Sequence, residues 1–169
     1  MTPDQGIDLE TALAGTPAGH KADVRLWLRL LSTVNLIEAE IRRRLREQFA
    51  TTLPRFDLMA QLDRMPDGLT LGEISRRLMV TNGNVTGLVD RLVADGLIVR
   101  EALGGDRRVT VAKLTKRGSA AFADMAEAHE GWLREMMGGV DAATRETLLG
   151  HLGALKTSVG NHVAEASPD

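Results

Sequence analysis

Apolar residues recur every three or four positions over a long stretch near the start of the chain. Between Ala22 and Phe49 this stripe consists of Val24, Leu28, Leu31, Val34, Ile37, Ile41 and Leu45. Such spacing predicts one long amphipathic helix. Trp27 and other apolar residues lie outside the stripe in the first half of the segment. We therefore expect that half to be buried by more than one neighbour.

Three shorter helices are predicted next. Pro54 suits the first position of a helix that we expect to reach Met65. Thr70 and Glu73 have the spacing of a capping box and predict the start of a third helix. We expect that helix to turn Ile74, Leu78 and Met79 inward. A fourth helix, capped by Thr81 and ending near Ala94, has the inward stripe Val85, Leu88, Val89, Leu92 and Val93.

The pattern then changes to short β-branched runs. Leu97–Val99 and Val109–Leu114 are joined by the tip Gly104–Arg108, which predicts a hairpin. Thr115 and Asp141 are suited to cap a fifth and a sixth helix, the last ending near Ala164. The expected fold is therefore mainly α, an α+β arrangement of six helices and one β-hairpin.

Composition narrows the class of protein. The 169 residues include no cysteine, which removes disulfides, thiolate zinc sites and thiol redox sensing. Only 3% of residues are aromatic, so we expect an aliphatic core. Neither a membrane-spanning run nor a signal peptide is recognisable, and the cytoplasm is the expected compartment. Motifs for a phosphate-binding loop, a nucleophile elbow or a catalytic metal are also missing, so we expect neither an enzyme nor a cofactor.

The charge is unevenly distributed along the chain, although its formal total is only −2. Residues 73–117 contain nine basic and five acidic side chains, a net charge of +4. Residues 1–20 carry −3, and residues 124–169 carry −5. Contact with phosphates requires local positive charge and does not require a basic protein. The central segment is therefore the candidate for binding a nucleic acid.

The fourth helix has the polarity that a helix in a DNA groove requires, since one face is apolar and the other carries small polar groups. Asparagine can bind adenine through two hydrogen bonds, and threonine can offer a hydroxyl or a methyl group to thymine. The candidate DNA contacts on this helix are Thr81, Asn82, Asn84, Thr86 and Arg91. Taken alone, the segment is equally compatible with an ordinary surface helix, but the hairpin that follows favours DNA.

The hairpin tip adds two further candidates, Arg107 and Arg108. Two arginines at a glycine-rich tip are poorly explained by stability, because exposed ion pairs contribute little to it. An arginine at this position can enter a narrow minor groove. We expect one arginine to reach the groove while Asp106 orients the other.

The residues from Leu53 to Gly118 resemble the MarR family of bacterial transcriptional regulators. The most specific match is Asp106-Arg-Arg108 followed by Leu114-Thr-Lys-Arg-Gly118. Other matching pieces are Leu53-Pro-Arg-Phe-Asp57-Leu-Met, Leu69-Thr-Leu-Gly-Glu-Ile-Ser-Arg-Arg-Leu78, Val85-Thr-Gly-Leu-Val-Asp-Arg-Leu92 and Gly96-Leu-Ile-Val-Arg100. This chain departs from many members at Gly87, where they carry a longer or basic side chain.

The resemblance implies a homodimer whose terminal helices interlock and whose two winged lobes bind a palindromic operator in double-stranded DNA. Within a MarR-type domain at 22–164, it places the DNA-binding lobe at 53–117, with the helix-turn-helix at 71–94 and the wing at 97–114. Residues 22–52 and 118–164 would form the dimerisation helices. Residues 1–21 would be a flexible arm. A repressor is the expected kind of regulator.

The resemblance also implies an effector pocket between the dimerisation helices and the winged lobe. A small aromatic acid or its coenzyme A thioester would bind there. Trp27 and Phe56 are candidates for stacking, and Arg55, Asp57 and Arg100 for polar contacts. Each also has a purely structural interpretation. The run Arg42–Arg46 would meet the phosphates of a thioester, or would simply form a solvated face paired with Glu38, Glu40 and Glu47.

Two alternatives remain open at this point. A metal-responsive regulator of the same fold could use His129 with Glu127 and Glu130, although His151 and His162 are too far apart along a helix to share an ion. A winged-helix module that binds proteins instead of DNA is the other alternative. Salt dependence of duplex binding separates the DNA-binding class from this module.

Overall fold

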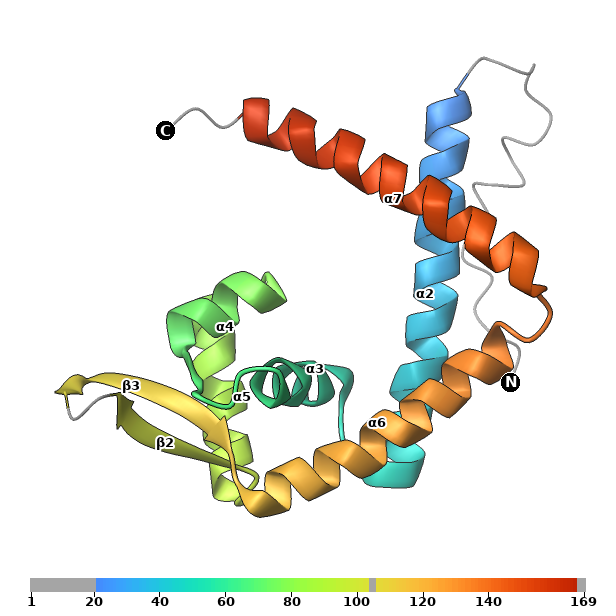
Figure 1. Ribbon diagram of the computed structural model, residues 1–169. Helices are drawn as coiled ribbons and strands as arrows, with labels where there is room; N and C mark the ends of the chain where they lie inside the picture. Colours follow the sequence, from blue (N-terminus) through green and yellow to red (C-terminus); the bar gives the residue numbers. More distant parts are fainter. Residues whose placement is uncertain (1–20, 104–105, 167–169) are drawn as a thin grey trace. The chain divides into compact units, whose positions relative to one another are not determined.

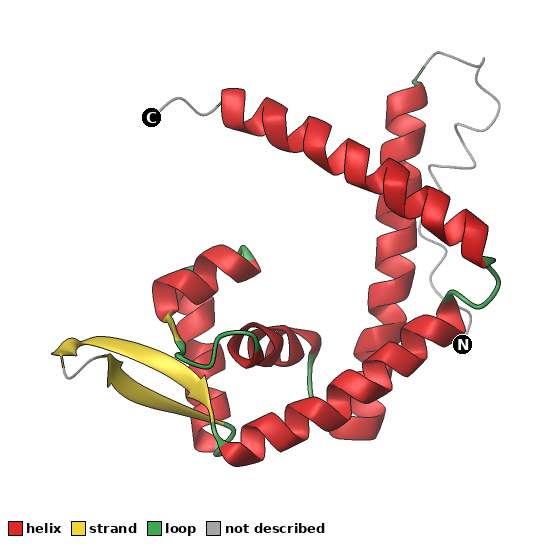
Figure 2. Ribbon diagram, viewed as in Figure 1, coloured by secondary structure: helices red, strands yellow, loops and turns green. Residues whose placement is uncertain are grey.

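The computed structural model describes residues 21–103 and 106–166, without the side chains of residues 82, 103 and 106–109. The predicted arm, residues 1–21, lies outside this description apart from Lys21. The described residues form six helices and three strands (Figure 1), and Figure 2 separates helices from strands by colour. In chain order these are α2 (Ala22–Phe49), α3 (Leu53–Asp63), β1 (Leu69–Thr70), α4 (Leu71–Leu78), α5 (Asn82–Ala94), β2 (Ile98–Leu103), β3 (Asp106–Leu114), α6 (Lys116–Met136) and α7 (Ala142–Glu165).

The mainly helical fold with a β-hairpin is thus confirmed. The chain divides into two compact units between His129 and Glu130, inside α6. The first unit contains α2, α3, the sheet, α4, α5 and the first part of α6. The second unit contains the end of α6 and all of α7.

Helix α2 has the predicted bounds, but its first half is not covered as expected. Only Ile41 and Leu45, both in the second half, are buried. Trp27 is 60% exposed and Leu36 is 73% exposed. The expected burial of the first half is therefore not provided by the described residues of the first unit.

The starts of α3 and α4 follow local capping rules. Helix α3 begins at Leu53 after the extended residue Thr52, so Pro54 is its second residue and not its first. The predicted capping box of α4 is confirmed. The Glu73 backbone N–H donates to Thr70 Oγ1 (3.3 Å), and the Thr70 backbone N–H donates to Glu73 Oε2 (2.8 Å). These reciprocal bonds satisfy two N–H groups that a helix start leaves without intrahelical partners.

Two residues predicted to point inward are exposed. Met79 follows the last residue of α4, has a positive φ of 53°, and is 92% exposed. Because the helix has ended, Met79 no longer follows its apolar stripe. On α5 the buried stripe consists of Val85, Val89 and Leu92. Val93 lies one residue beyond this stripe, about 100° around the helix from Leu92, and is exposed.

The three strands form an antiparallel sheet in the order β1-β3-β2. Strand β1, which pairs Leu69 with Ala112, was not predicted, because two residues carry no detectable alternation. The hairpin strands are longer than predicted, since Leu103 pairs with Asp106. Arg107 and Arg108 therefore lie in β3 and not in the turn. The turn residues 104–105 lie outside the described residues.

The core of the first unit is aliphatic, as composition predicted. Helices α3, α4 and α5 and the sheet contribute its largest fully buried side chains, including Leu58, Leu62, Ile74, Val89 and Ile98. A small aromatic cluster adjoins it. The Phe56 ring lies 5.6 Å from Phe122 and 4.9 Å from His129, measured between ring centroids.

The junction between the sheet and α6 explains the segment Leu114-Thr-Lys-Arg-Gly118. The Thr115 hydroxyl donates to the Gly96 carbonyl oxygen (2.8 Å) and accepts from the Gly118 backbone N–H (2.9 Å). The Thr115 backbone N–H donates to the Leu97 carbonyl oxygen (3.0 Å). A Cβ atom on Gly118 would lie only 1.9 Å from that same oxygen. Glycine is required here because the start of α6 lies directly against the Leu97 backbone.

Helix α7 begins as predicted, with Asp141 accepting a hydrogen bond from the Thr144 backbone N–H (2.9 Å). Residues 142–165 include no buried side chain. Large apolar side chains are exposed along this helix, including Leu149 at 67% and Val159 at 55%. Within the described part of the chain, no helix has the length and apolar character needed to cross a membrane.

Candidate nucleic-acid interface

Helix α5 is the centre of the candidate interface. Its apolar stripe is buried, whereas Asn84, Thr86 and Arg91 are exposed on the remaining surface. Thr81 precedes the helix with an extended backbone and is its N-cap residue, as predicted. Its hydroxyl accepts no capping hydrogen bond from the described residues. Asn82 is the first residue of the helix, and its side chain lies outside the description.

The exposed face of α5 is unusually open near its start. A Cβ atom on Gly83 or Gly87 would meet nothing within 4 Å. Packing against the described residues therefore does not require glycine at these two positions. Small residues there permit a close approach of another molecule to the backbone of the helix.

Two ion pairs hold the second half of α5 in place. Asp90 Oδ1 lies 2.7 Å from Arg100 Nη2 on β2. Asp95, which follows the last residue of α5, pairs with Arg55 on α3. The helix is thus tied both to the hairpin and to α3, so its exposed face has a defined position within the first unit.

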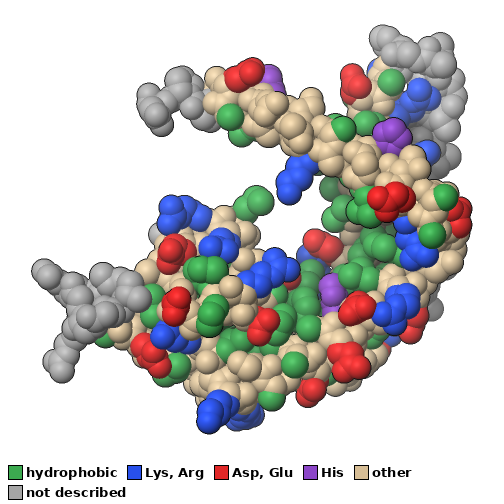
Figure 3. All heavy atoms as spheres, in the orientation of Figure 1, with side chains coloured by type: hydrophobic (Ala, Val, Ile, Leu, Met, Phe, Trp, Pro, Cys, Tyr) green, Lys and Arg blue, Asp and Glu red, His purple; other side chains and the backbone are tan. Residues whose placement is uncertain are grey.

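Basic residues surround α5 on neighbouring elements. Arg76 and Arg77 are exposed in the last turn of α4. Arg107 and Arg108 are the second and third residues of β3, although their side chains lie outside the description. On the face drawn in Figure 3, acidic and basic side chains are interspersed and do not form one patch of a single sign. Arg76 and Arg77 are thus the described exposed basic residues on the helix that precedes α5.

The five predicted ligand-binding residues have different surroundings in the structure. Trp27 is exposed on α2, and Phe56 is buried in the aromatic cluster. Arg55 and Arg100 are engaged in the ion pairs that hold α5. Of these residues, only Asp57 lines a cleft formed by α3, α4 and α5. The assignment of all five to one pocket stays a prediction.

That cleft has a volume of about 460 Å³ and lies between the start of α3, the end of α4 and α5. Its lining combines apolar side chains with a few polar ones, among them Asn84 and Arg91. Small-molecule sites have this size and this kind of lining. The sequence did not reveal the cleft, because three separate segments contribute to it and none has a recognisable motif.

Asp57 is the acidic residue of the cleft. Burial raises the pKa of its carboxyl group, and the nearby negative charge of Glu38 raises it further. The positive charge of Arg42 opposes these two effects. Asp57 is thus a half-buried carboxylate for which a hydrogen-bond donor would be favourable.

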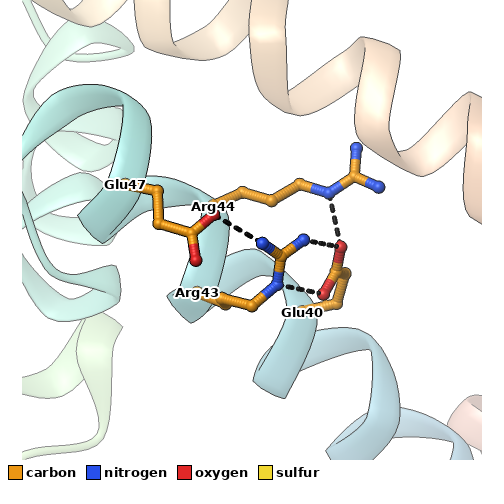
Figure 4. A network of polar contacts seen from close by, with 4 residues as sticks. All are labelled: Glu40, Arg43, Arg44 and Glu47. Atoms are coloured by element: carbon orange, nitrogen blue, oxygen red, sulfur yellow. Dashed lines mark hydrogen bonds and ion pairs between the residues drawn. The ribbon is translucent and has the colours of Figure 1, made fainter.

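The basic run on α2 is paired with acids, as one of the two interpretations predicted. Figure 4 shows Arg43 between Glu40 and Glu47, with Arg44 also bonded to Glu40. The hydrogen bonds from Arg43 and Arg44 lower the pKa of Glu40 to about 2. Arg42 pairs separately with Glu38 (2.6 Å). Most of this positive charge is therefore balanced on the helix itself.

The described residues contain no group of three or more His, Asp or Glu side chains that could hold a metal ion. His129 packs against Phe56, and burial lowers the pKa of its imidazole. The predicted set of His129, Glu127 and Glu130 is thus not found as a metal-binding group.

Comparisons with known proteins agree with this geometry. A family model described as MarR family matches residues 51–109. A crystal structure of a MarR family transcriptional regulator from Silicibacter pomeroyi is 35% identical in sequence. It superposes with a TM-score of 0.72 over 85% of this chain and 99% of its own. The chain belongs to the MarR family. It is accordingly a member of a family of transcriptional regulators.

Two curated relatives have lower sequence identity to this chain. The uncharacterized HTH-type transcriptional regulator YsmB of Bacillus subtilis is 27% identical over 73% of this chain and 82% of its own length. The transcriptional activatory protein BadR of Rhodopseudomonas palustris is 29% identical over 61% of this chain. The match covers 59% of BadR, less than two thirds of that protein. These names describe regulators and not enzymes.

Proposed function

We propose that this MarR-family member is a ligand-responsive repressor that binds a palindromic operator as a homodimer. A small aromatic acid or an aromatic acyl-CoA would release it from DNA. The observation that carries the proposal is helix α5, which buries one aliphatic face and exposes small polar residues. A two-stranded hairpin that contains Arg107 and Arg108 follows this helix.

The chemistry of α5 supports binding in the major groove. Asn84 can contact an adenine through two hydrogen bonds, and Thr86 can approach a thymine methyl group. Arg91 adds a positive charge further along the helix. Thr81 and Asn82, at the helix start, are placed where backbone N–H groups favour a phosphate oxygen. The hairpin supplies Arg107 and Arg108 for an adjacent minor groove.

Exposed apolar surface supports the homodimer. Helix α7 has no buried residue, and several large apolar side chains in the first half of α2 are exposed. Large apolar side chains gathered on an exposed helix usually mark an interface. A second copy of the chain is the partner that the two-fold symmetry of a palindrome requires. Its α5 would lie roughly 34–36 Å from the first, one turn of DNA away.

The operator is the first object of the test. Full-length protein would be used to select binding sites from random duplex DNA, and the selected sites would be footprinted. We expect an inverted repeat with two protected half-sites. Selection of no duplex, or protection of one half-site by a monomer, would contradict the proposal.

The contribution of the wing is tested on the selected duplex. The double variant Arg107→Ala/Arg108→Ala should bind more weakly while remaining dimeric. Arg43→Ala/Arg46→Ala removes the same charge from the exposed surface of α2 and should bind as the unchanged protein does. Equal affinities of the two double variants would refute a specific role for the wing.

The sign of regulation is tested separately, because the name of the relative BadR describes an activator. A reporter driven by a promoter that contains the selected site should be less active when the protein is present. Aromatic acids and their CoA thioesters should restore its activity. If the reporter instead required the protein for expression, the protein would be an activator and not a repressor. The proposed DNA binding would still stand.

A further inference from the structure

Hydrogen bonds to Ser75 hold the turn between α4 and α5. The Ser75 carbonyl oxygen accepts from the backbone N–H groups of Met79 and Val80, the second at 3.2 Å. The Ser75 hydroxyl donates to the Val80 carbonyl oxygen (2.5 Å). These bonds hold the backbone of Met79, the residue that follows α4, in the left-handed conformation, with a φ of 53°.

Packing does not explain a methionine at this position. Glycine is the residue that most often follows a helix in the left-handed conformation, because a Cβ atom disfavours this conformation in other residues. The side chain of Met79 is 92% exposed, so burial does not compensate for this cost. A long apolar side chain is thus held in solvent at a disfavoured backbone position, which points to a role outside the packing of the described residues.

Met79 is also the most exposed methionine among the described residues. Met137 is 38% exposed. The other described methionines are buried or half-buried, namely Met59, Met65, Met125 and Met136. The 169 residues include no cysteine, so no thiol competes for an oxidant. A small oxidant in solution would therefore meet the sulphur of Met79 first.

The position of Met79 connects its oxidation to DNA binding. Arg76 and Arg77 precede it in the last turn of α4, and Thr81, the N-cap of α5, follows two residues later. In a helix-turn-helix the first helix crosses the DNA backbone and the second enters the major groove. The turn between them would then lie beside sugar and phosphate groups. A thioether suits such a place, because it is only a weak acceptor and needs no donor.

Oxidation turns this side chain into a strong hydrogen-bond acceptor. When hypochlorous acid reacts with a thioether, its O–Cl bond breaks, an S=O bond forms, and a proton and a chloride ion are released. The sulphur loses two electrons, and the chlorine gains them as it becomes chloride. The product, methionine sulfoxide, is polar. Phosphate oxygens are acceptors as well and offer no donor, so a sulfoxide oxygen beside them would lose water without gaining a hydrogen bond.

We propose that Met79 is an oxidation site for hypochlorous acid, and that its sulfoxide weakens the binding of operator DNA by α5. The inference rests on the proposed function, because it takes α4 and α5 to bind DNA. It adds a signal that reaches the DNA-binding lobe directly and that requires neither a cysteine nor a bound effector. Methionine sulfoxide reductases reduce sulfoxides to thioethers, so the signal is reversible.

Peptide mapping tests where the oxidant reacts. Full-length protein without DNA is treated with one equivalent of hypochlorous acid per chain, and the reaction is quenched with free methionine. Mass spectrometry of the digested protein then locates the added oxygen. We expect the sulfoxide of Met79 to form before that of any other methionine. If Met79 reacted no faster than Met137, the proposal would be overturned.

DNA binding is measured before and after the same treatment, by fluorescence anisotropy of the selected duplex. We expect the apparent Kd of the unchanged protein to rise roughly tenfold, the effect of one acceptor left without a donor. Methionine sulfoxide reductase should restore the original Kd. Met79→Leu keeps the apolar bulk without the sulphur, so its Kd should not change on treatment. Met137→Leu is the matched control and should lose affinity as the unchanged protein does.

The untreated protein separates this inference from the proposed function. If it binds the duplex and the sulfoxide of Met79 forms without a change in Kd, the inference is overturned and the proposed function stands. The same holds if Met79→Leu loses as much affinity on treatment as the unchanged protein. If the untreated protein selects no duplex, the proposed function fails and this inference fails with it.

Discussion

Replacing Gly118 with alanine tests how the hairpin is joined to α6. The added Cβ atom would lie 1.9 Å from the Leu97 carbonyl oxygen and 2.9 Å from its carbonyl carbon. Ordinary contact begins near 3.4 Å, so the start of α6 and the Leu97 backbone must separate by about 1.5 Å. Backbone lies on both sides of this contact, and no flexible side chain can move away to relieve it.

The separation would strain the hydrogen bonds that cross the junction. Overpacking of this kind costs about 1–3 kcal/mol. The Thr115 N–H donates to Leu97 and the Thr115 hydroxyl donates to Gly96. Loss of these two hydrogen bonds adds about 1 kcal/mol for each. The better helix propensity of alanine offsets about 1 kcal/mol. We therefore expect Gly118→Ala to lower the free energy of unfolding by about 2–4 kcal/mol, a large part of the usual 5–15 kcal/mol.

Urea denaturation followed by circular dichroism measures this loss, at one fixed protein concentration for all variants. Gly72→Ala is the control, since Gly72 is exposed in α4 and a Cβ atom there would meet nothing within 4 Å. It should be neutral or stabilising by up to about 1 kcal/mol. If Gly118→Ala were as stable as Gly72→Ala, the close approach of Gly118 to Leu97 would be wrong.

Four further predictions concern the cap of α4, a half-buried histidine and an ion pair of the first unit. Thr70→Val should destabilise the protein by about 1 kcal/mol in urea, because it removes the hydroxyl that caps α4, and an unchanged midpoint would contradict this. Hydrogen bonds from Thr70 lower the pKa of Glu73. The ionised Glu73 therefore stabilises the protein above pH 4.5, and this stabilisation is lost as pH falls through the lowered pKa. This pH dependence should vanish in Glu73→Gln. Burial lowers the pKa of His129, so the unfolded chain takes up a proton at higher pH than the folded chain does. The free energy of unfolding should therefore fall as pH drops below 6.5. His129→Phe should flatten that part of the dependence of stability on pH. A double-mutant cycle on Asp90 and Arg100 should give a coupling of about 0.2–1 kcal/mol, as both side chains are partly exposed, and a zero value would remove this link between α5 and the hairpin.

The sequence predicted those parts of the fold that depend on neighbours close in the chain. The capping box of Thr70 and Glu73, the cap at Asp141 and the long helix α2 are all governed by residues within a few turns. The apolar stripe of α5 was predicted for the same reason, except at its margin. The prediction that Met79 points inward was wrong, because α4 ends one residue earlier. A stripe of apolar residues does not reveal where a helix ends.

Features that join distant segments were not predictable in the same way. Strand β1 exists because Leu69 pairs with Ala112, far along the chain. The ion pair of Arg55 with Asp95 assigns a structural role to a predicted ligand-binding residue. The cleft beside α5 likewise combines three segments, and only Asp57 of the predicted ligand set lies in it. No local pattern specifies which distant side chains will meet.

The salt dependence of binding to the selected palindromic duplex tests the central claim most directly. Two winged lobes with at least two phosphate contacts each predict that log K falls with log salt concentration with a slope of about −3.6 or steeper. Arg107→Ala/Arg108→Ala should make the slope shallower, whereas Arg43→Ala/Arg46→Ala should leave it unchanged. A protein that binds no duplex even at low salt, or whose binding is independent of salt, would contradict the account and favour a module that binds proteins.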